Sequence, residues 1–234
     1  SYGAVYSVIR NNFNSGNHQE IIRALKIIDK DKINMSSEGN EEIKNEINVL
    51  RTIDHPNVMK IYEFYEDEQN IYVIAEFCDG GDLGKIMDKY GVFPEFLLKY
   101  IMYQVFIGIT FLHFQNVVHT DLKRENIAFV TLTNKKTKMK TNVFENIIKN
   151  KEISDELNKC PSLENLSKEA MKIVKELSNY EIKIVDFGSA KINKRNKKLS
   201  GITGTAYYCS PEIVHENYSF PCDEWACGVM MYIL

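Results

Sequence analysis

The sequence predicts an α+β protein, with strands concentrated in its first part and helices in the rest. Two observations support this prediction. Up to residue 77 the apolar residues fall into short runs rich in β-branched and aromatic side chains, separated by polar turns, which is typical of strands. After the Gly80-Gly81 pair they recur at helical spacing, most clearly over residues 95–114. We therefore expect a small antiparallel sheet followed by a mainly helical region.

Two hairpins and one helix account for the strand-rich part. Ile43, Ile47 and Leu50 share one face at helical spacing, and Asn40 suits the N-terminal cap of such a helix. The predicted elements are a hairpin within residues 2–28, a helix over 40–53, and a second hairpin that joins 58–65 to 71–77.

The composition excludes several classes of protein. The 234 residues include 29 Lys and Arg against 32 Asp and Glu, a formal net charge of −3, which argues against a nucleic-acid binder that relies on positive charge. Apolar runs such as residues 220–234 are shorter than the ~20 residues of a membrane span, and no signal segment opens the chain. The five Cys are scattered, so we expect free thiols rather than disulfides or a zinc site. These features favour a soluble, cytoplasmic protein.

Residues 131–180 differ in composition from their surroundings. They are rich in Lys, Asn, Thr and Glu, and a strand-like run resumes at 182–185. Apolar residues at near-helical spacing over 162–177 predict an insertion with at least one helix of its own. The Lys-rich run at 135–140 is expected to be a solvated surface.

Two motifs carry chemistry. The first is His-Thr-Asp-Leu-Lys-Arg-Glu-Asn at residues 119–126, and the second is Asp186-Phe187-Gly188. Phosphoryl transfer from ATP needs a carboxylate near the attacking hydroxyl, oxygen ligands for Mg²⁺ and cations that spread the phosphate charge. An Asp, a Lys two residues on and an Asn five residues on, followed later by D-F-G, is the pattern of protein kinases. The sequence therefore resembles a protein kinase catalytic domain.

The resemblance extends over almost the whole chain and implies a bilobal, protein-kinase-like fold. Residues 1–77 would form the N-terminal lobe, beginning inside the phosphate-binding loop, and 78–234 an incomplete C-terminal lobe that contains the insertion. Residues 204–212 resemble the substrate-docking segment that ends in A-P-E, and Asp223 resembles the start of the central helix of that lobe. The match implies further chain on both sides.

The resemblance also assigns catalytic roles. Asp121 would orient the substrate hydroxyl and accept its proton, while Lys123 would stabilise the transferring phosphoryl group. Lys26 would contact the ATP phosphates, held in place by Glu46 on the apolar face of the predicted helix. The implied Mg²⁺ ligands are Asn126 and Asp186. His119 is expected to be structural.

A nucleotide pocket is implied in the same way. Glu76, Phe77 and Cys78 align with the hinge that meets adenine through backbone groups, which places Ala75 at the gatekeeper position, usually a larger residue. Ala128 aligns with the side chain under the adenine ring, so the pocket is expected to be enlarged. The cofactor-binding residues implied are Gly3, Val5, Ala24, Lys26, Ala75, Glu76, Cys78, Asp82, Glu125, Asn126, Ala128 and Asp186.

The resemblance narrows to one subgroup of Ser/Thr kinases. Segments 54–64 and 76–83 look most like calcium-dependent and calmodulin-dependent-type protein kinases, and Lys123 is the Ser/Thr-type choice. Asp82 and Glu125 align with acidic positions that many relatives use to attract basic residues near the target Ser or Thr of protein substrates. No EF-hand loop occurs here, so a calcium-sensing segment would lie outside this chain.

Three departures from the family pattern matter. Thr120 replaces the Arg that meets a phosphate on the activation loop, so activity is expected to be largely independent of that phosphate. Arg124 stands where the family usually has Pro. The insertion lies between two paired strands, so its ends must be close together and we expect an appendage. The alternative to an enzyme is a pseudokinase that binds ATP or acts as a scaffold; the six polar catalytic residues favour the enzyme.

Overall fold

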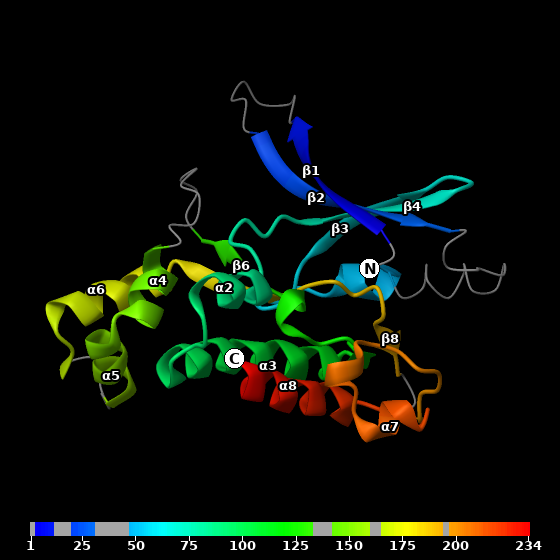
Figure 1. Ribbon diagram of the computed structural model, residues 1–234. Helices are drawn as coiled ribbons and strands as arrows, with labels where there is room; N and C mark the ends of the chain where they lie inside the picture. The colour runs from blue at the N-terminus through cyan, green and yellow to red at the C-terminus, as the bar shows by residue number, and fades with distance from the viewer. Residues whose placement is uncertain (1–2, 12–19, 31–46, 133–141, 160–164, 194–196) are drawn as a thin grey trace. The chain divides into compact units, whose positions relative to one another are not determined.

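The computed structural model describes residues 3–11, 20–30, 47–132, 142–159, 165–193 and 197–234. The chain divides into two compact units, residues 1–78 and 79–234. Figure 1 gives the element labels used below.

The first unit is built on a four-stranded antiparallel sheet with the order β1-β2-β4-β3. Its strands are β1 (Gly3–Asn11), β2 (Glu20–Asp29), β3 (Ile61–Glu66) and β4 (Asn70–Glu76). Residues 47–52 are helical, and residues 40–46 of the predicted helix lie outside the described residues. The two predicted hairpins are present, and the predicted α+β class is confirmed.

The core of the first unit follows from the alternation of β4. Ile71, Val73 and Ala75 are buried on one face of this strand, while the residues between them are partly exposed. Ile47 and Leu50, one helical turn apart, are also buried. The two periods, 2 for the strand and 3.6 for the helix, produce the two apolar faces of this core.

The second unit is mainly helical and contains two short antiparallel strand pairs, β5 with β8 and β6 with β7. Its helices outside the insertion are α2 (Leu83–Tyr90), α3 (Glu95–Phe114), α7 (Pro211–Val214) and α8 (Pro221–Ile233). Its strands are β5 (Val117–Val118), β6 (Ile127–Thr131), β7 (Tyr180–Ile184) and β8 (Lys191–Ile192). Short 3₁₀ helices occur at Arg124–Asn126 and Ala206–Tyr208.

Helix α3 is a core helix of the second unit. Leu97, Ile101, Val105 and Leu112 are fully buried along one stripe. By length and composition alone α3 could also cross a membrane. This helix was not among the apolar runs considered in the sequence. Length and composition are weak evidence for a span, because a core helix meets the same two criteria.

The described part of the insertion contains three helices, in agreement with the prediction of at least one: α4 (Asn142–Lys149), α5 (Lys151–Lys159) and α6 (Lys168–Leu177). The helix predicted over 162–177 corresponds to α6, which begins later because the Ser167 hydroxyl accepts a hydrogen bond from the Ala170 N–H and caps it. Helices α4 and α5 were not predicted. In residues 151–159 charged side chains outnumber apolar ones, so the helical pattern there is faint.

The insertion is packed into the second unit, and the expectation of an appendage is wrong. Phe144 of α4 is fully buried, and its ring centroid lies 4.8 Å from that of Phe129 in β6. The Tyr100 hydroxyl of α3 donates to the Leu177 and Tyr180 carbonyls at 3.2 and 3.1 Å, and burial raises its pKa. Helix α4 also contacts α2, and α5 contacts α3 (Figure 1). The expectation failed because the ends of an insertion can lie close together while its helices still bury a large apolar area against the rest of the unit.

Candidate active site

In the first unit, the strand register places four predicted nucleotide-binding residues on one face of the sheet. Lys26 of β2 lies opposite Val5 of β1 and Val73 of β4. Two residues away on β2, Ala24 lies opposite Ala75 of β4. Residues two apart on a strand share a face, and so do directly opposed residues. This face therefore carries Lys26 between two valines, with the two alanines next to them along β2 and β4.

The other predicted residues of this unit lie at its edges. Gly3 opens β1 opposite Ile28, and Glu46 lies outside the described residues. Glu76 ends β4, where its backbone N–H donates to the Lys60 carbonyl at 2.8 Å and its carboxylate accepts from the Lys60 N–H at 3.2 Å. The Glu76 side chain thus ties β4 to the segment before β3. Cys78, two residues on, is partly buried.

In the second unit, Asp121 is the centre of a hydrogen-bonded network. The Lys123 ammonium donates to Asp121 Oδ2 and to Thr205 Oγ1, each at 2.7 Å. The Thr205 hydroxyl donates in turn to Asp121 Oδ1 at 2.7 Å, across 84 residues of sequence. The amide nitrogen of Asn126, a buried residue, donates to the Asp121 carbonyl at 2.8 Å. One carboxylate is thereby held by a cation and a hydroxyl, with the bond lengths of charge-assisted hydrogen bonds.

The backbone of this loop is fixed by Asp223 at the start of α8. Asp223 is 1% exposed and accepts hydrogen bonds from the backbone N–H groups of His119 and Thr120, both at 2.9 Å. His113 Nε2 lies 2.8 Å from the same carboxylate. Thr120 has a φ of 65°, a conformation that β-branched residues rarely adopt. The two bonds to Asp223 hold the strained backbone in place.

The Asp-Phe-Gly motif follows β7 and is anchored on the same loop. Asp186 has a φ of 61°, and its Oδ1 accepts from the Gly188 N–H at 3.2 Å. The Phe187 ring packs against His119, with centroids 5.2 Å apart. His119 Nε2 lies 3.1 Å from the Val185 carbonyl, which agrees with the structural role expected for this histidine.

Asn126 and Asp186 are a suitable pair of ligands for Mg²⁺, because an amide oxygen and a carboxylate are both hard oxygen donors. Since the Asn126 nitrogen donates to Asp121, its oxygen is the atom left to meet a metal. No cluster of three or more His, Cys, Asp and Glu side chains in the described part of the chain is arranged to hold a metal. Such a two-residue site fits Mg²⁺, which takes its remaining ligands from water and phosphate oxygens.

Thr120 also contacts the activation segment. Its hydroxyl donates to the Ser189 carbonyl at 2.7 Å and lies 3.4 Å from the Thr203 hydroxyl. A phosphate on Thr203 would therefore meet a neutral hydroxyl at this position, instead of a bidentate guanidinium. At Ser200, the second possible phosphate acceptor of this segment, the Lys191 ammonium of β8 donates to the backbone carbonyl at 2.9 Å.

The cysteine beside the network is a structural donor. The Cys209 thiol donates to the Thr203 and Thr205 carbonyls at 3.3 and 3.4 Å. Burial raises the pKa of this thiol, and the Asp121 carboxylate raises it further. Burial also raises the pKa of Cys222 and Cys227. The four cysteines in the described ranges form no disulfide with one another, and the raised pKa values of Cys209, Cys222 and Cys227 favour unreactive thiols.

The predicted acidic pair lies near Ala128. Asp82 and Ala128 form an antiparallel β-bridge, and Ala128 is buried. A Cβ atom added to Gly84 would lie 3.1 Å from Asp82 Oδ1 and 3.2 Å from Glu125 Cγ. The two acids are therefore neighbours, one on each side of this glycine.

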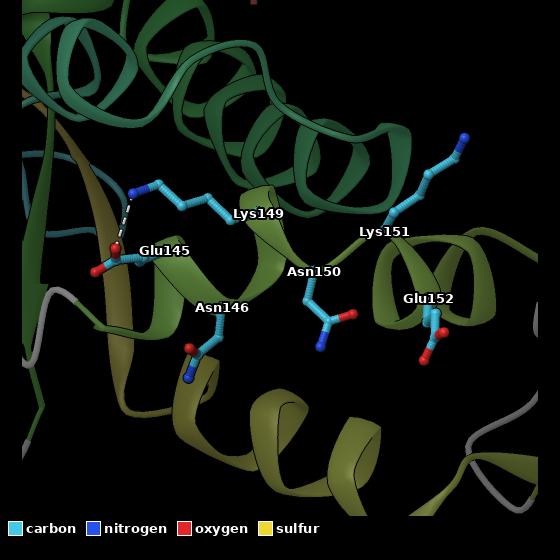
Figure 2. Close-up of a pocket in the computed structure, with 6 residues that line it drawn as sticks. All are labelled: Glu145, Asn146, Lys149, Asn150, Lys151 and Glu152. Carbon is cyan, nitrogen blue, oxygen red and sulfur yellow. Dashed lines mark hydrogen bonds and ion pairs between the residues drawn. The ribbon is translucent and has the colours of Figure 1, made fainter.

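A hollow outside these networks lies at the junction of α4 and α5 (Figure 2), where Lys149 and Glu145 form an ion pair at 2.9 Å. It is lined by Glu145, Asn146, Lys149, Asn150, Lys151 and Glu152. None of the residues predicted for catalysis or nucleotide binding lines it, and its charges are mixed. We therefore assign it no ligand.

Two residues of the network were not among the predicted site residues. Thr205 holds Asp121 and Lys123 together, and Asp223 holds the loop backbone. Both belong to sequence patterns noted above, the docking segment at 204–212 and the start of the central helix. The sequence therefore identified the segments that contain Thr205 and Asp223, but not the hydrogen bonds that these residues make.

A carboxylate held by a lysine and a threonine, with a buried Asn bonded to the same residue, is the arrangement expected at the site of a phosphotransferase. The protein kinase domain family matches residues 1–234, and the chain belongs to this family. The predicted kinase fold class is thereby confirmed.

Curated relatives place the chain near the calcium-dependent kinases, as predicted. It is 32% identical to Calcium-dependent protein kinase 5 of Plasmodium falciparum (isolate 3D7), over 98% of the chain and 34% of that protein. It is 34% identical to Calcium-dependent protein kinase 5 of Plasmodium berghei (strain Anka), over 91% and 29%. It is 31% identical to CDPK-related kinase 4 of Arabidopsis thaliana, over 90% and 28%. The chain spans about a third of the length of these relatives.

Proposed function

We propose that this chain is the catalytic domain of a Ser/Thr protein kinase that transfers the γ-phosphate of ATP to protein substrates. The observation that carries the proposal is the network in which Lys123 and Thr205 both bond Asp121. A carboxylate so oriented can accept the proton of an attacking hydroxyl, which is the main acid–base task in this reaction.

The other predicted site residues would act on the phosphates and on the metal. Lys123, 2.7 Å from Asp121, places a positive charge where charge develops on the transferring group. Lys26 would hold the phosphates from the sheet of the first unit, and Asn126 with Asp186 would hold the metal. Bound ATP with Mg²⁺ supplies the phosphoryl group and the charge that neutralises it.

The test uses purified protein containing residues 1–234, ATP, Mg²⁺ and a set of Ser and Thr peptides. We expect phosphoserine or phosphothreonine by mass spectrometry, and none when EDTA removes the metal. Absence of transfer to every peptide would favour a pseudokinase, an alternative that the comparisons do not support.

We also propose that the whole protein is regulated by calcium, because the relatives are named calcium-dependent protein kinases. Because the sequence contains no EF-hand loop, calcium would act through a segment outside this chain. Peptide phosphorylation by residues 1–234 alone should then be equal in Ca²⁺ and in EGTA.

Activation-loop phosphorylation is expected to matter little. Replacing Ser200 and Thr203 together by Ala should change turnover by less than about tenfold, or roughly 1.4 kcal/mol of barrier, because Thr120 offers a phosphate no guanidinium. The measurement is the steady-state rate on a Ser peptide. Thr205→Ala in the same segment is the control, and it should lower the rate because it removes the hydroxyl on Asp121. A loss of several orders of magnitude in the Ser200/Thr203 variant would contradict the prediction.

Ala75 is expected to admit bulky inhibitors. The structure buries Ala75 opposite Ala24 of β2 and Ile61 of β3, so on the β2 side its cross-strand neighbour is also an alanine. Changing Ala75 to Met should weaken an ATP-site inhibitor with a bulky aromatic group by roughly 2 kcal/mol, while the KM for ATP moves little. The check is a pair of titrations, inhibitor and ATP, on both proteins. Equal inhibitor potency on the two proteins would show that Ala75 is not the gatekeeper residue.

A further inference from the structure

Arg124, the residue in place of the usual Pro, forms an ion pair with Glu125, one of the two acids that the family pattern assigns to substrate recognition. Its Nε lies 3.1 Å from Glu125 Oε1, and its Nη1 lies 3.1 Å from Asp88 Oδ1. Nη1 also contacts the Met87 sulfur at 3.3 Å. The Arg124 side chain is 24% exposed, while its partners Glu125 and Asp88 are 48% and 67% exposed. The guanidinium is thus seated between the 3₁₀ helix Arg124–Asn126 and α2.

The second predicted acid is engaged as well. Asp82 caps α2 by accepting from the Lys85 N–H at 2.9 Å, and its other oxygen pairs with the Lys85 ammonium at 2.8 Å. Lys85 is 82% exposed, so this pair is weak and easily exchanged. Arg124 is far less exposed and has two carboxylate partners. Of the two intramolecular cations, Arg124 is therefore the harder one for an incoming charge to displace.

We infer that Arg124 sets substrate specificity by filling the acidic subsite from within the chain. Three carboxylates, those of Asp82, Asp88 and Glu125, face two cations in this cluster. A basic substrate residue would have to displace Arg124 from Glu125 or sit beside a like charge, and both are unfavourable. The chain therefore does not require basic residues upstream of the target hydroxyl and accepts neutral ones equally well. This inference rests on the proposed function and reverses the basic preference expected from the sequence.

The test compares two Ser peptides that differ only in carrying Arg or Ala within the four residues upstream of the Ser. For the unmodified protein we expect kcat/KM values within about threefold of each other. Arg124→Ala frees Glu125, so the ratio should rise to about tenfold or more in favour of the Arg peptide. The double variant Arg124→Ala/Glu125→Gln should return the ratio to that of the unmodified protein.

Lys99→Ala is the matched control, because Lys99 is an exposed cation of the same unit that pairs with Glu95 at 2.6 Å; its ratio should not change. Affinities of both peptides, measured by fluorescence anisotropy on the same variants, give the same comparison without turnover. If no peptide is phosphorylated, the proposed function fails and the affinity ratio still decides the role of Arg124. A strong Arg preference in the unmodified protein, or an unchanged ratio in Arg124→Ala, overturns the inference.

Discussion

Changing Asp121 to Asn is expected to lower kcat by about 10²–10⁴-fold, the range for loss of a general base. The amide cannot accept the proton of the substrate hydroxyl, although it has nearly the same shape. It can still accept one hydrogen bond, so the bonds from Lys123 and Thr205 are partly retained. The check is the rate at saturating ATP and peptide, together with the melting temperature, which should fall only slightly.

The isosteric change Thr205→Val separates orientation from proton transfer. It removes the hydroxyl that donates to Asp121 and accepts from Lys123, but leaves the base itself, so its loss in rate should be smaller. Glu152→Gln, on an exposed position of α5, is the control and should have no effect. If Asp121→Asn retained the unmodified rate, Asp121 would not be the catalytic base.

The parts of this protein that could be predicted from the sequence are those encoded locally. The loop at 119–126 brings Asp121, Lys123 and Asn126 together because they lie within six residues of each other. The pairings within the two predicted hairpins, β1 with β2 and β3 with β4, join strands that are neighbours in the sequence. Such contacts follow from spacing and period alone.

Long-range contacts could not be predicted in this way. The bond from Thr205 to Asp121 spans 84 residues, and that from the His119 N–H to Asp223 spans 104. The sequence identified the segments but not the atoms that meet. Arg124 illustrates the same limit, because its departure from the family pattern was visible whereas its partner Asp88 on α2 was not.

The insertion is the part of the chain for which the expectation from the sequence differed most from the structure. An appendage was expected because the ends of the insertion must lie close together, yet Val143, Phe144 and Ile147 of α4 are at most 1% exposed. A few apolar residues at helical spacing are enough to bury one face of a short helix, whatever the average composition. The opposite, solvent-exposed face of such a helix can then carry the Lys and Glu residues that make the average composition polar.

Deleting residues 133–178 and joining the ends with a short Gly-Ser turn is therefore expected to abolish soluble folding of the second unit. The deletion removes the Phe144 ring that packs on Phe129, as well as the Leu177 carbonyl that accepts from Tyr100. It leaves a core strand and part of α3 facing water. Exposed apolar patches of this kind favour aggregation.

A single substitution tests the same packing without removing the chain. Phe144→Ala should lower the free energy of unfolding by about 3–5 kcal/mol, the usual cost of truncating a fully buried Phe. The measurement is urea unfolding followed by circular dichroism. Met171→Ala on α6, where the side chain is 38% exposed, is the matched control and should cost about 1 kcal/mol or less. A deletion variant that stays soluble, combined with a Phe144→Ala variant as stable as the unmodified protein, would return the insertion to the status of an appendage. If only the substitution proves costly, the insertion helices form a core of their own, and β6 tolerates their removal.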